Sequence, residues 1–421
     1  MSVSVCSDKI DLMTHHMRVL EGSNFQLKEV ALSDQSSWAL VNDSISHISG
    51  GFFHVLGVKD RNYSDFSNIV LYQPQSALTG LLIKIQDGVV YTCVQARAEP
   101  GNTGVVQFGP SIQSTAANYL KMHGGKETDF LEHFQSFPGQ SRLLSFNLQT
   151  DLGKLYYQKS KSQMYVLVDE FIATTPNTVW IPVSVLSKAS CDSYLLNTDL
   201  RSLLAMFDWD GLLRRSSCSG SAPLELLNYY YASRLQSNHR FSLCGLSELE
   251  NWIVDDFGIS SSTEANRSLK YYDVRAESRE VTQWFQPLID CETRGSIILY
   301  RQSTANGPLY LLSVLNEFGI DHETIVGPSV VVHPGDSASN VEIFGSLFRG
   351  FEHSEEGGRF INHESSVQVR NVSSDFVAGR NQFWVSVSEL KGLLKSSNLV
   401  SIQLRVVVSA LLDELNPESL S

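Results

Sequence analysis

Residues 94–125 read VQARAEPGNTGVVQFGPSIQSTAANYLKMHGG, and they begin within the second of two alternating apolar runs that meet at an Asp-Gly pair at 87–88. Such a pair between β-branched runs is typical of a β-hairpin with a tight turn. The second strand of this hairpin places Gln95, Arg97 and Glu99 on one face, because successive side chains of a strand point to opposite faces. The stretch therefore predicts a strand that presents three polar groups to a common surface.

Turn signals break the chain after this strand. Pro-Gly at 100–101 and Gly-Pro at 109–110 indicate loops, and a short helical piece follows that ends at the glycines 124–125. A single polar residue usually faces water, but this stretch gathers many hydrogen-bonding side chains and so indicates a binding surface. The candidates are Gln95, Arg97, Glu99, Gln113, Asn118, Tyr119, Lys121 and His123.

The chain reads as one unit present twice. Blocks of the first half recur in the same order in the second half, which indicates a duplicated architecture. The recurring blocks are AEPG at 98–101 and NEFG at 316–319, GPSI at 109–112 and GPSV at 327–330, LGKLYYQ around Gly153 and GGRFINH around Gly358, and WIPVSVLSK at 180–188 and WVSVSELKG at 384–392.

Each copy predicts an α+β unit. Residues 8–21 and 222–236 carry apolar residues at helical spacing, so each copy opens with a helix. Strands, the polar stretch or its counterpart, more strands and a further helix follow. We expect a first unit at 1–210, a linker rich in serine and glycine at 211–222, and a second unit at 223–421.

The composition excludes several classes of function. With 32 basic against 45 acidic residues the net charge is −13, which repels nucleic acid and anionic lipid. The six cysteines are scattered without CxxC or Cys/His pairing, which predicts neither a zinc site nor a secreted disulfide framework. No apolar run approaches membrane-spanning length, and no export signal opens the chain. We expect a cytoplasmic protein that binds neither nucleic acid nor membrane.

Three runs of the first copy, QARAEPGN, GPSIQST and NYLKMHGGK, resemble the sugar-nucleotide 2,3-dehydratase family. Matches at Asn197-x-Asp199-x-Arg201, at 286–288 (QPL) and at 354–360 (SEEGGRF) extend the resemblance over most of the chain. The resemblance implies two tandem Nudix-like α/β/α units, a homodimer, and a hydro-lyase that removes the C2 hydroxyl of a nucleoside-diphosphate 4-keto-6-deoxyhexose, with dTDP as the expected nucleotide. A 3-ketoreductase would then consume the 3,4-diketo product in deoxysugar biosynthesis.

The Nudix likeness raises metal-dependent diphosphate hydrolysis as a rival function. That chemistry needs the run REUxEExGU, whose carboxylates bind magnesium, and no stretch of this sequence has it. GxGxxG, P-loop and GxSxG motifs are missing as well. We therefore expect an elimination that uses side chains alone, with no metal and no cofactor.

This elimination needs a base for the C3 hydrogen, donors for the enolate and an acid for the departing C2 hydroxyl. Glu99, Tyr119 and His123 are the candidate catalytic residues, and the sequence leaves the identity of the base open. The candidate substrate-binding residues are Gln95, Arg97, Gln113, Asn118, Lys121, Asn197, Asp199, Arg201, Glu356 and Arg359.

The two copies are not equivalent. The second copy has no amide at the Gln113 position and no Asn-Tyr or His-Gly-Gly, although it alone carries SEEGGRF. We expect one working pocket, in the first copy, that could draw groups from both copies or across a dimer. Arg201 recurs as Arg405, which favours a structural role for both. Because the second copy has lost the signature, a catalytically silent relative that binds a sugar nucleotide or a partner is the alternative function.

Overall fold

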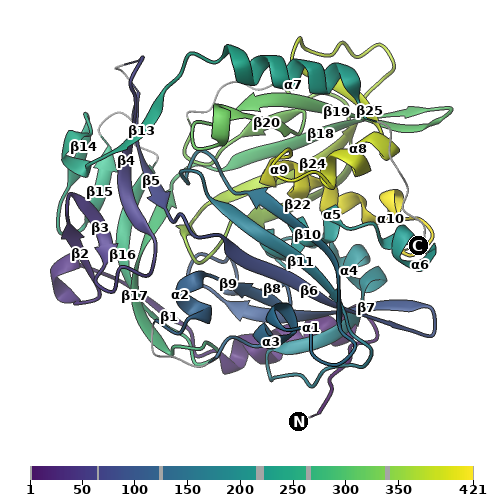
Figure 1. Cartoon of the computed structure of the whole chain (residues 1–421), viewed down its shortest axis with the longest axis horizontal. Helices are drawn as coiled ribbons and strands as arrows, with labels where there is room; N and C mark the ends of the chain where they lie inside the picture. The colour runs from purple at the N-terminus through teal and green to yellow at the C-terminus, as the bar shows by residue number, and fades with distance from the viewer. Residues whose placement is uncertain are drawn as a thin grey trace.

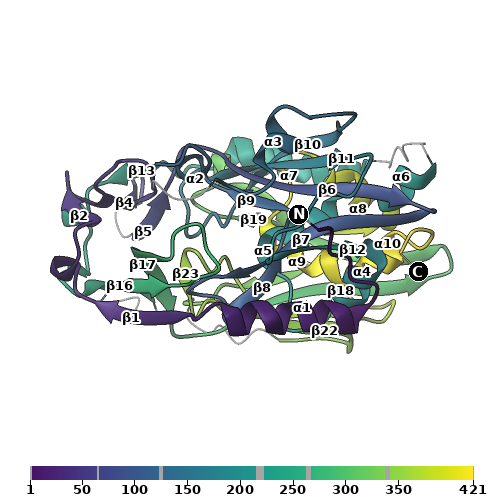
Figure 2. The ribbon, with the colours of Figure 1, turned by 90° about the horizontal axis from the view of Figure 1, so that it is seen from below.

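The structure is a computed structural model that describes residues 2–63, 66–122, 127–214, 222–261, 267–336 and 342–420. Within these residues, two seven-stranded sheets form most of the molecule, and a five-stranded and a six-stranded sheet lie together at one end (Figure 1). Helices pack against and between the sheets (Figure 2). The arrangement confirms the predicted α+β class.

Each copy builds one seven-stranded sheet. The first copy contributes β6 (Ala77–Gln86), β7 (Val89–Ala98), β8 (Val106–Gly109), β9 (Ile112–Ser114), β10 (Arg142–Thr150), β11 (Ser160–Leu167) and β12 (Thr178–Pro182). The second copy contributes β18 (Gly295–Thr304), β19 (Gly307–Asn316), β20 (Thr324–Gly327), β21 (Val330–Val332), β22 (Ser346–Ser354), β24 (Glu364–Asn371) and β25 (Gln382–Ser386).

The two large sheets have the same topology. In the first, β10, β11, β6, β7 and β12 are neighbours in that order, with β8 beside β7 and β9 beside β6. In the second, β22, β24, β18 and β19 follow the same order, with β20 and β25 beside β19 and β21 beside β18. The pairs β11·β6 and β24·β18 are both parallel. This correspondence confirms the duplication.

The predicted hairpin is present between β6 and β7. Asp87 and Gly88 have φ angles of 51° and 78°, the left-handed values that a tight primed turn requires at both central positions. Gln86 pairs with Val89 directly across this turn.

Helices open both copies, as predicted. Asp8 caps α1 (Lys9–Gly22), and α7 (Leu224–Gln236) stands at the start of the second copy. The helices α5 (Thr198–Met206) and α9 (Ile402–Val408) pack on each other between the two large sheets (Figure 2). The remaining helices are α2 (Ala116–Tyr119), α3 (Leu131–Gln135), α4 (Val183–Ala189), α6 (Trp209–Arg214), α8 (Val387–Leu394) and α10 (Leu412–Leu415), with 3-10 turns at Leu32–Asp34, Leu246–Glu248, Asp321–Glu323 and Ser409–Leu411.

The two smaller sheets exchange one strand between the copies. The five-stranded sheet consists of β2 (Trp38–Val41), β3 (Ser44–His47), β4 (His54–Asp60) and β5 (Ser67–Tyr72) of the first copy and β13 (Phe241–Cys244) of the second. The six-stranded sheet consists of β14 (Trp252–Val254), β15 (Gly258–Ser261), β16 (Arg267–Arg275), β17 (Gln283–Cys291) and β23 (Phe360–Ile361) of the second copy and β1 (Gln26–Val30) of the first.

This exchange interlocks the two copies. The β1 strand pairs with β16, with Lys28 opposite Asp273, and β13 pairs with β4, with Leu243 opposite Val58. A boundary drawn near residue 210 in the sequence therefore divides both small sheets. Of the predicted linker, residues 211–214 belong to α6, and residues 215–221 lie outside the described residues.

Two arginines in matching positions join α5 to α9. Arg201 donates from Nη1 to Ser409 Oγ at 3.1 Å, and Arg405 donates from Nη1 to Ser202 Oγ at 3.0 Å. Both arginines are almost fully buried, and Arg201 also donates to the Leu196 and Ser190 carbonyls. The hydrogen bonds of the Arg201 guanidinium thus stabilise the fold, in agreement with the structural role that its recurrence as Arg405 favours.

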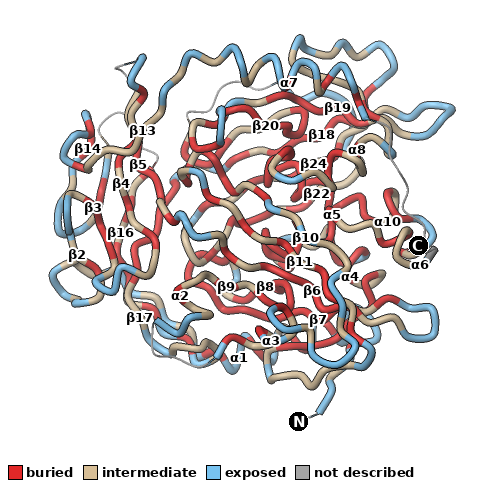
Figure 3. The backbone as a smooth tube through the Cα atoms, viewed as in Figure 1, coloured by how far each residue is buried: buried red, intermediate tan, exposed pale blue. Residues whose placement is uncertain are grey.

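Burial is continuous across the two copies (Figure 3). The largest apolar cluster combines Ile69 and Leu155 of the first copy with Leu299 and Val326 of the second. One shared core, together with the exchanged strands, makes the two copies a single packed body. In the part of the chain that the structure describes, no helix is both long and apolar enough to cross a membrane.

Candidate active site

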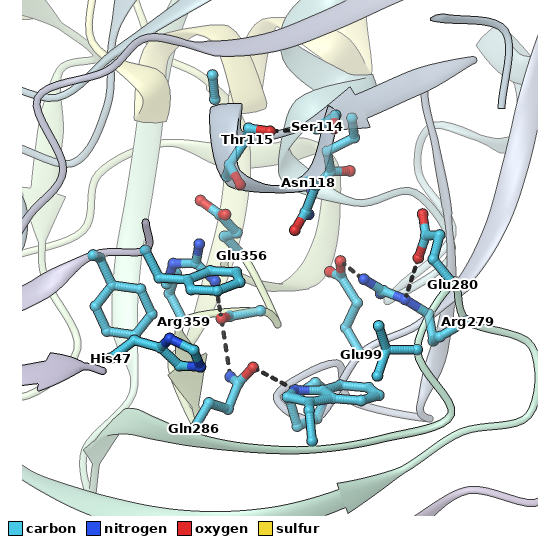
Figure 4. Close-up of a pocket in the computed structure, with 18 of the residues that line it drawn as sticks. His47, Glu99, Ser114, Thr115, Asn118, Arg279, Glu280, Gln286, Glu356 and Arg359 are labelled. Carbon is cyan, nitrogen blue, oxygen red and sulfur yellow. Dashed lines mark hydrogen bonds and ion pairs between the residues drawn. The ribbon is translucent and has the colours of Figure 1, made fainter. Parts of the chain in front are cut away.

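A cavity of about 600 Å³ lies between the two copies (Figure 4). The first copy supplies the polar end of β7, the β9–α2 segment, Lys161 of β11 and Asp199 of α5. The second copy supplies the segment between β16 and β17, the first residues of β17 and the turn after β22. Its charged and amide lining residues are Arg97, Glu99, Gln113, Asn118, Lys161, Asp199, Arg279, Glu280, Gln283, Gln286, Glu356 and Arg359.

Close approach of the backbones creates this shared wall. Gly101 N donates to Gly357 O at 2.8 Å, and a Cβ at Gly101 would lie 1.5 Å from Phe360 O. The loop after β7 therefore requires a glycine here. In the second copy Gly319 N donates to Gly153 O at 2.7 Å. Gly153 thus corresponds to Gly357, which corrects the sequence alignment with Gly358 by one residue.

The first polar wall is the face of β7. Gln95, Arg97 and Glu99 share that face, as predicted, and all three are buried. Arg97 donates to Gln95 Oε1 at 2.9 Å and to Glu99 Oε1 at 3.3 Å, and Arg279 of the second copy donates to Glu99 Oε1 at 3.3 Å. The other oxygen, Glu99 Oε2, has no hydrogen-bond partner. Two guanidinium groups therefore position the Glu99 carboxyl group through Oε1, and Oε2 remains without a hydrogen-bond partner.

A second acid reinforces the guanidinium groups of this wall. Glu280 accepts from Arg279 Nε at 3.3 Å. Burial alone would raise the pKa of Glu280, but Arg279 and Arg97 lower it to about 2. Two carboxyl groups and two guanidinium groups thus lie together along the wall, and the guanidinium groups favour the charged form of Glu280.

The second polar wall is an ammonium surrounded by carboxylates. Lys161 Nζ lies 2.9 Å from Asp151 Oδ2, 2.9 Å from Asp199 Oδ1 and 3.1 Å from Glu356 Oε2. Lys161 and its partners are largely buried, and Glu356 comes from the second copy. Tyr156 also donates to Glu356 Oε2, at 3.1 Å. We call Lys161, Asp151, Asp199 and Glu356 the acid–ammonium cluster. Its ion pair between Lys161 and Glu356 links the two copies, in addition to the backbone hydrogen bond between Gly101 and Gly357.

Two acids of the acid–ammonium cluster, Asp199 and Glu356, differ in pKa. Burial raises the pKa of Asp199 to about 6, against the lowering effect of Lys161. Burial acts on Glu356 in the same direction, but Lys161 and Arg359 together lower its pKa to about 2. One acid of the wall is therefore poised to carry a proton near neutral pH, whereas its neighbour stays ionised.

An aromatic wall closes the cavity. Trp38 Nε1 donates to Phe285 O at 2.6 Å, which ties the five-stranded sheet to β17. The Arg359 guanidinium lies 4.5 Å from the centre of the Phe53 ring, close enough for cation–π attraction. Further aromatic lining comes from His47, Phe52 and Trp284. Such a wall is suited to a flat ligand group beside the charged walls.

The predicted residues divide into three groups. Lining the cavity are Arg97, Glu99, Gln113, Asn118, Asp199, Glu356 and Arg359. Outside its lining but in contact with it are Gln95, bonded to Arg97, and Asn197, which caps α5 and donates to Gln113 Oε1 at 2.9 Å. Away from the cavity are Arg201, between α5 and α9, Tyr119, packed in an apolar cluster, and Lys121, 3.5 Å from Glu127 at the surface, while His123 lies outside the described residues.

Sequence reasoning missed Lys161, Arg279, Glu280 and the aromatic wall. A signal for Lys161 existed, because Lys159, directly before β11, alternates with Lys161 and Gln163 within that strand, as in the polar face of β7. All three side chains are buried. No local pattern marks Arg279 as a cavity residue, since Glu99 and the Ala98 carbonyl, to which it donates, lie in the other copy.

The counterpart of Glu99 in the second copy is buried among other residues. Glu317, the counterpart of Glu99, accepts from Gly153 N at 2.8 Å, and Phe318 packs against Phe66 and Phe241. Burial raises the pKa of Glu317 to about 7. Its surroundings are those of a packed interior.

Comparison with known proteins agrees with this geometry. The sequence profile described as NDP-hexose 2,3-dehydratase matches residues 11–207 and again residues 224–411. The chain belongs to the NDP-hexose 2,3-dehydratase family. It is 27% identical to a dTDP-4-dehydro-6-deoxy-alpha-D-glucopyranose 2,3-dehydratase of Streptomyces violaceoruber, over 91% of this chain and 93% of the relative. Enzymes of the same name from Saccharopolyspora spinosa (24%, over 97% and 93%) and Amycolatopsis orientalis (23%, over 96% and 91%) are also similar.

Each repeat of this NDP-hexose 2,3-dehydratase family member is thus matched separately, and the relatives span both repeats. Among the residues that the structure describes, no group of three or more His, Cys, Asp or Glu side chains is arranged to hold a metal ion. The groups available for chemistry in the described cavity are its carboxylates, its cations and its amides.

Proposed function

We propose that this chain is a hydro-lyase that removes water across C2 and C3 of dTDP-4-dehydro-6-deoxyglucose and gives a 3,4-diketo-2,6-dideoxy sugar. The observation that carries the proposal is the unpartnered Glu99 Oε2 in the cavity of a family member. A buried carboxylate oxygen without a partner is costly, and a substrate hydrogen would give it a function.

The chemistry needs no group beyond the cavity side chains. The C3 hydrogen is acidic because the C4 carbonyl stabilises the resulting enolate, so a positioned carboxylate removes it. The enolate then re-forms the C4 carbonyl, a C2–C3 double bond appears and the C2 hydroxyl leaves as water. The enol that remains tautomerises to the 3,4-diketone.

Glu99 is the proposed base. Arg97 and Arg279 both donate to Glu99 Oε1, so they fix the position of the carboxyl group and leave Oε2 for the substrate. Of the other two candidate bases, Tyr119 packs against an apolar cluster and is not among the residues that line the cavity, and His123 lies outside the described residues. Gln113 and Asn118 are proposed to bind sugar hydroxyls, and Arg359 is proposed to bind the diphosphate beside the aromatic wall.

Finer features of the proposal rest on the resemblance. We infer that each unit is Nudix-like, that the protein is a cytoplasmic homodimer, and that a 3-ketoreductase consumes the product. A 3,4-diketone is reactive, and its prompt reduction limits side reactions, which supports the role of the 3-ketoreductase.

The direct test is incubation of the pure protein with dTDP-4-dehydro-6-deoxyglucose, a 3-ketoreductase and NADPH. We expect NADPH oxidation that depends on this chain and, by mass spectrometry, a dTDP-sugar product that has lost one water and gained the two hydrogens of the reduction. Tight binding of the nucleotide sugar without any loss of water would instead favour the catalytically silent relative.

A further inference from the structure

The acid–ammonium cluster lies on a different wall of the cavity from the proposed base. Asp199 is the second residue of α5 and lines the cavity that Glu99 also lines. The Lys161 ammonium group forms ion pairs with three carboxylates, two from the first copy and one from the second. An elimination needs an acid for the departing hydroxyl as well as a base, so this wall is the place to look for it.

The repeat shows that the fold does not require three of these four charges. Strand pairing sets Thr150 opposite Ser160 and Ser354 opposite Glu364, which aligns the two copies residue by residue. By this alignment Lys161 and Asp199 of the first copy correspond to Ser365 and Gln403 of the second, and Glu356 of the second copy corresponds to Leu152 of the first. Asp151 alone has an acidic counterpart, Glu355.

Arg201 and Arg405 show the opposite behaviour. They occupy equivalent positions and make reciprocal bonds, so the fold uses both. The acid–ammonium cluster is complete only beside the cavity. Taking several charged groups out of water is costly, and a cost that is borne at only one of the two equivalent places in the repeat points to chemistry.

The surroundings of the two cavity acids distinguish their roles. Glu356 accepts from Lys161 and Tyr156 and lies in the field of Arg359, which keeps it ionised. Asp199 is almost fully buried where it lines the cavity, and it accepts a hydrogen bond from Lys161 Nζ at 2.9 Å. A pKa raised to about 6 supports a protonated Asp199 in part of the population near neutral pH.

We infer, on the basis of the proposed function, that Asp199 gives its proton to the C2 hydroxyl and that Lys161 is the residue that positions it. As the C2–O bond breaks, its electron pair leaves with the oxygen, and the proton of Asp199 completes a water molecule. Asp199 becomes a carboxylate beside the Lys161 ammonium, and Glu99 keeps the proton taken from C3. Atoms and charges balance without an added reactant.

A change of leaving group tests this role. Fluoride departs from carbon without being protonated, so a dTDP-4-dehydro-2-fluoro-2,6-dideoxyglucose still needs the base but not the acid. We expect Asp199→Asn to reduce water elimination from the natural substrate by about 100-fold or more, and fluoride release from the analogue by less than about tenfold. Glu99→Gln should reduce both reactions alike.

The control is Gln403→Met, a change of similar volume at the counterpart of Asp199 in the second copy. It should leave both reactions within about threefold of the wild type. Thermal melting establishes that each variant is folded. Equal losses of both reactions in a folded Asp199→Asn protein, or no loss in either, would overturn the assignment. A wild-type protein that releases neither water nor fluoride would overturn the proposed function itself.

The pH dependence of turnover tests the positioning role of Lys161. The ammonium lowers the pKa of Asp199, so Lys161→Met should extend the activity that remains to higher pH. The charged groups that act on Asp199 are Lys161, Asp151, Glu356, Arg97 and Arg405. A folded Lys161→Met protein whose turnover falls with pH as in the wild type would contradict a positioning role.

Discussion

Glu99 and Glu317 stand at matching points directly after β7 and β19, in different surroundings. Glu99 lies between two guanidinium groups and lines the cavity. Glu317 is enclosed beside Gly153, and burial raises its pKa to about 7. The same residue type is thus an available base in one copy and a packed acid in the other.

We predict that Glu99→Gln lowers kcat by about 100-fold or more, because general-base loss acts on the chemical step. The affinity for dTDP, measured by calorimetry, should stay nearly unchanged. The matched variant Glu317→Gln should keep kcat and alter mainly the melting temperature. If Glu317→Gln abolished turnover in a folded protein while Glu99→Gln did not, the second copy would hold the active pocket.

Glu355 is the counterpart of Asp151, and it is buried behind the cavity wall. It accepts from Thr198 Oγ1 at 3.2 Å, and His353 Nε2 lies 3.9 Å away. Burial, and then the charge of Asp151, raises the pKa of Glu355 to about 8. The folded protein therefore binds a proton here more tightly than the unfolded chain, where the pKa of glutamate is about 4.3.

The sign of the pH effect follows from that difference. The contribution of Glu355 to stability is fully present below pH 4 and is lost as the pH rises toward 8. We predict that Glu355→Gln removes this loss, so that the free energy of unfolding of the variant rises relative to wild type by about 3 kcal/mol between pH 5 and pH 8. Urea denaturation at both pH values measures it. A constant difference between the two proteins would show that Glu355 titrates normally.

Among the elements, β1 and β13 decide how the copies depend on each other. Each leaves its own copy and completes a small sheet of the other, where it covers a strand that would otherwise present unpaired backbone groups. The packing of α5 on α9 adds buried contact between the copies. Neither copy contains all the strands of the sheet that it mainly builds.

We predict that residues 1–214 and residues 215–421, expressed separately, will not unfold cooperatively, because each half exposes sheet edges and half of the shared core. Co-expression of the two halves should restore a soluble complex with 2,3-dehydratase activity. Circular dichroism melting and the coupled reductase assay measure the two outcomes. A cooperative melt of either half alone would show that the exchanged strands are dispensable.

At the scale of the whole molecule, the cavity belongs to neither copy. The proposed base comes from the first copy, and its Arg279 partner comes from the second. Glu356 closes the acid–ammonium cluster from the second copy as well. One duplicated chain thereby obtains an asymmetric site from two units of the same topology.

The reaction as a whole is predicted to be independent of metal. The sequence has no REUxEExGU run to bind magnesium, and the proposed proton transfers use carboxylates of the cavity. Dialysis against EDTA should therefore leave the rate of diketone formation unchanged in the coupled assay. Loss of turnover that added magnesium restores would revive metal-dependent hydrolysis as the function.

The sequence alone was enough for the duplication, the α+β class and the polar face of β7. These features depend on the order of blocks and on a side-chain period of two, both of which can be read along the chain. Periodicity also located the opening helices and the Asp87-Gly88 turn. The motif resemblance indicated the family that the comparison confirms.

Only the tertiary structure decided where the site lies and which groups complete it. Arg279 reaches Glu99 across 180 residues of chain, and Lys161 reaches Glu356 across 195. The strand exchange and the correspondence of Gly153 with Gly357 likewise depend on pairing between distant segments. A local pattern states which face of an element is polar. Which distant element meets that face is determined by packing of the whole chain, because long-range contacts have no local periodicity.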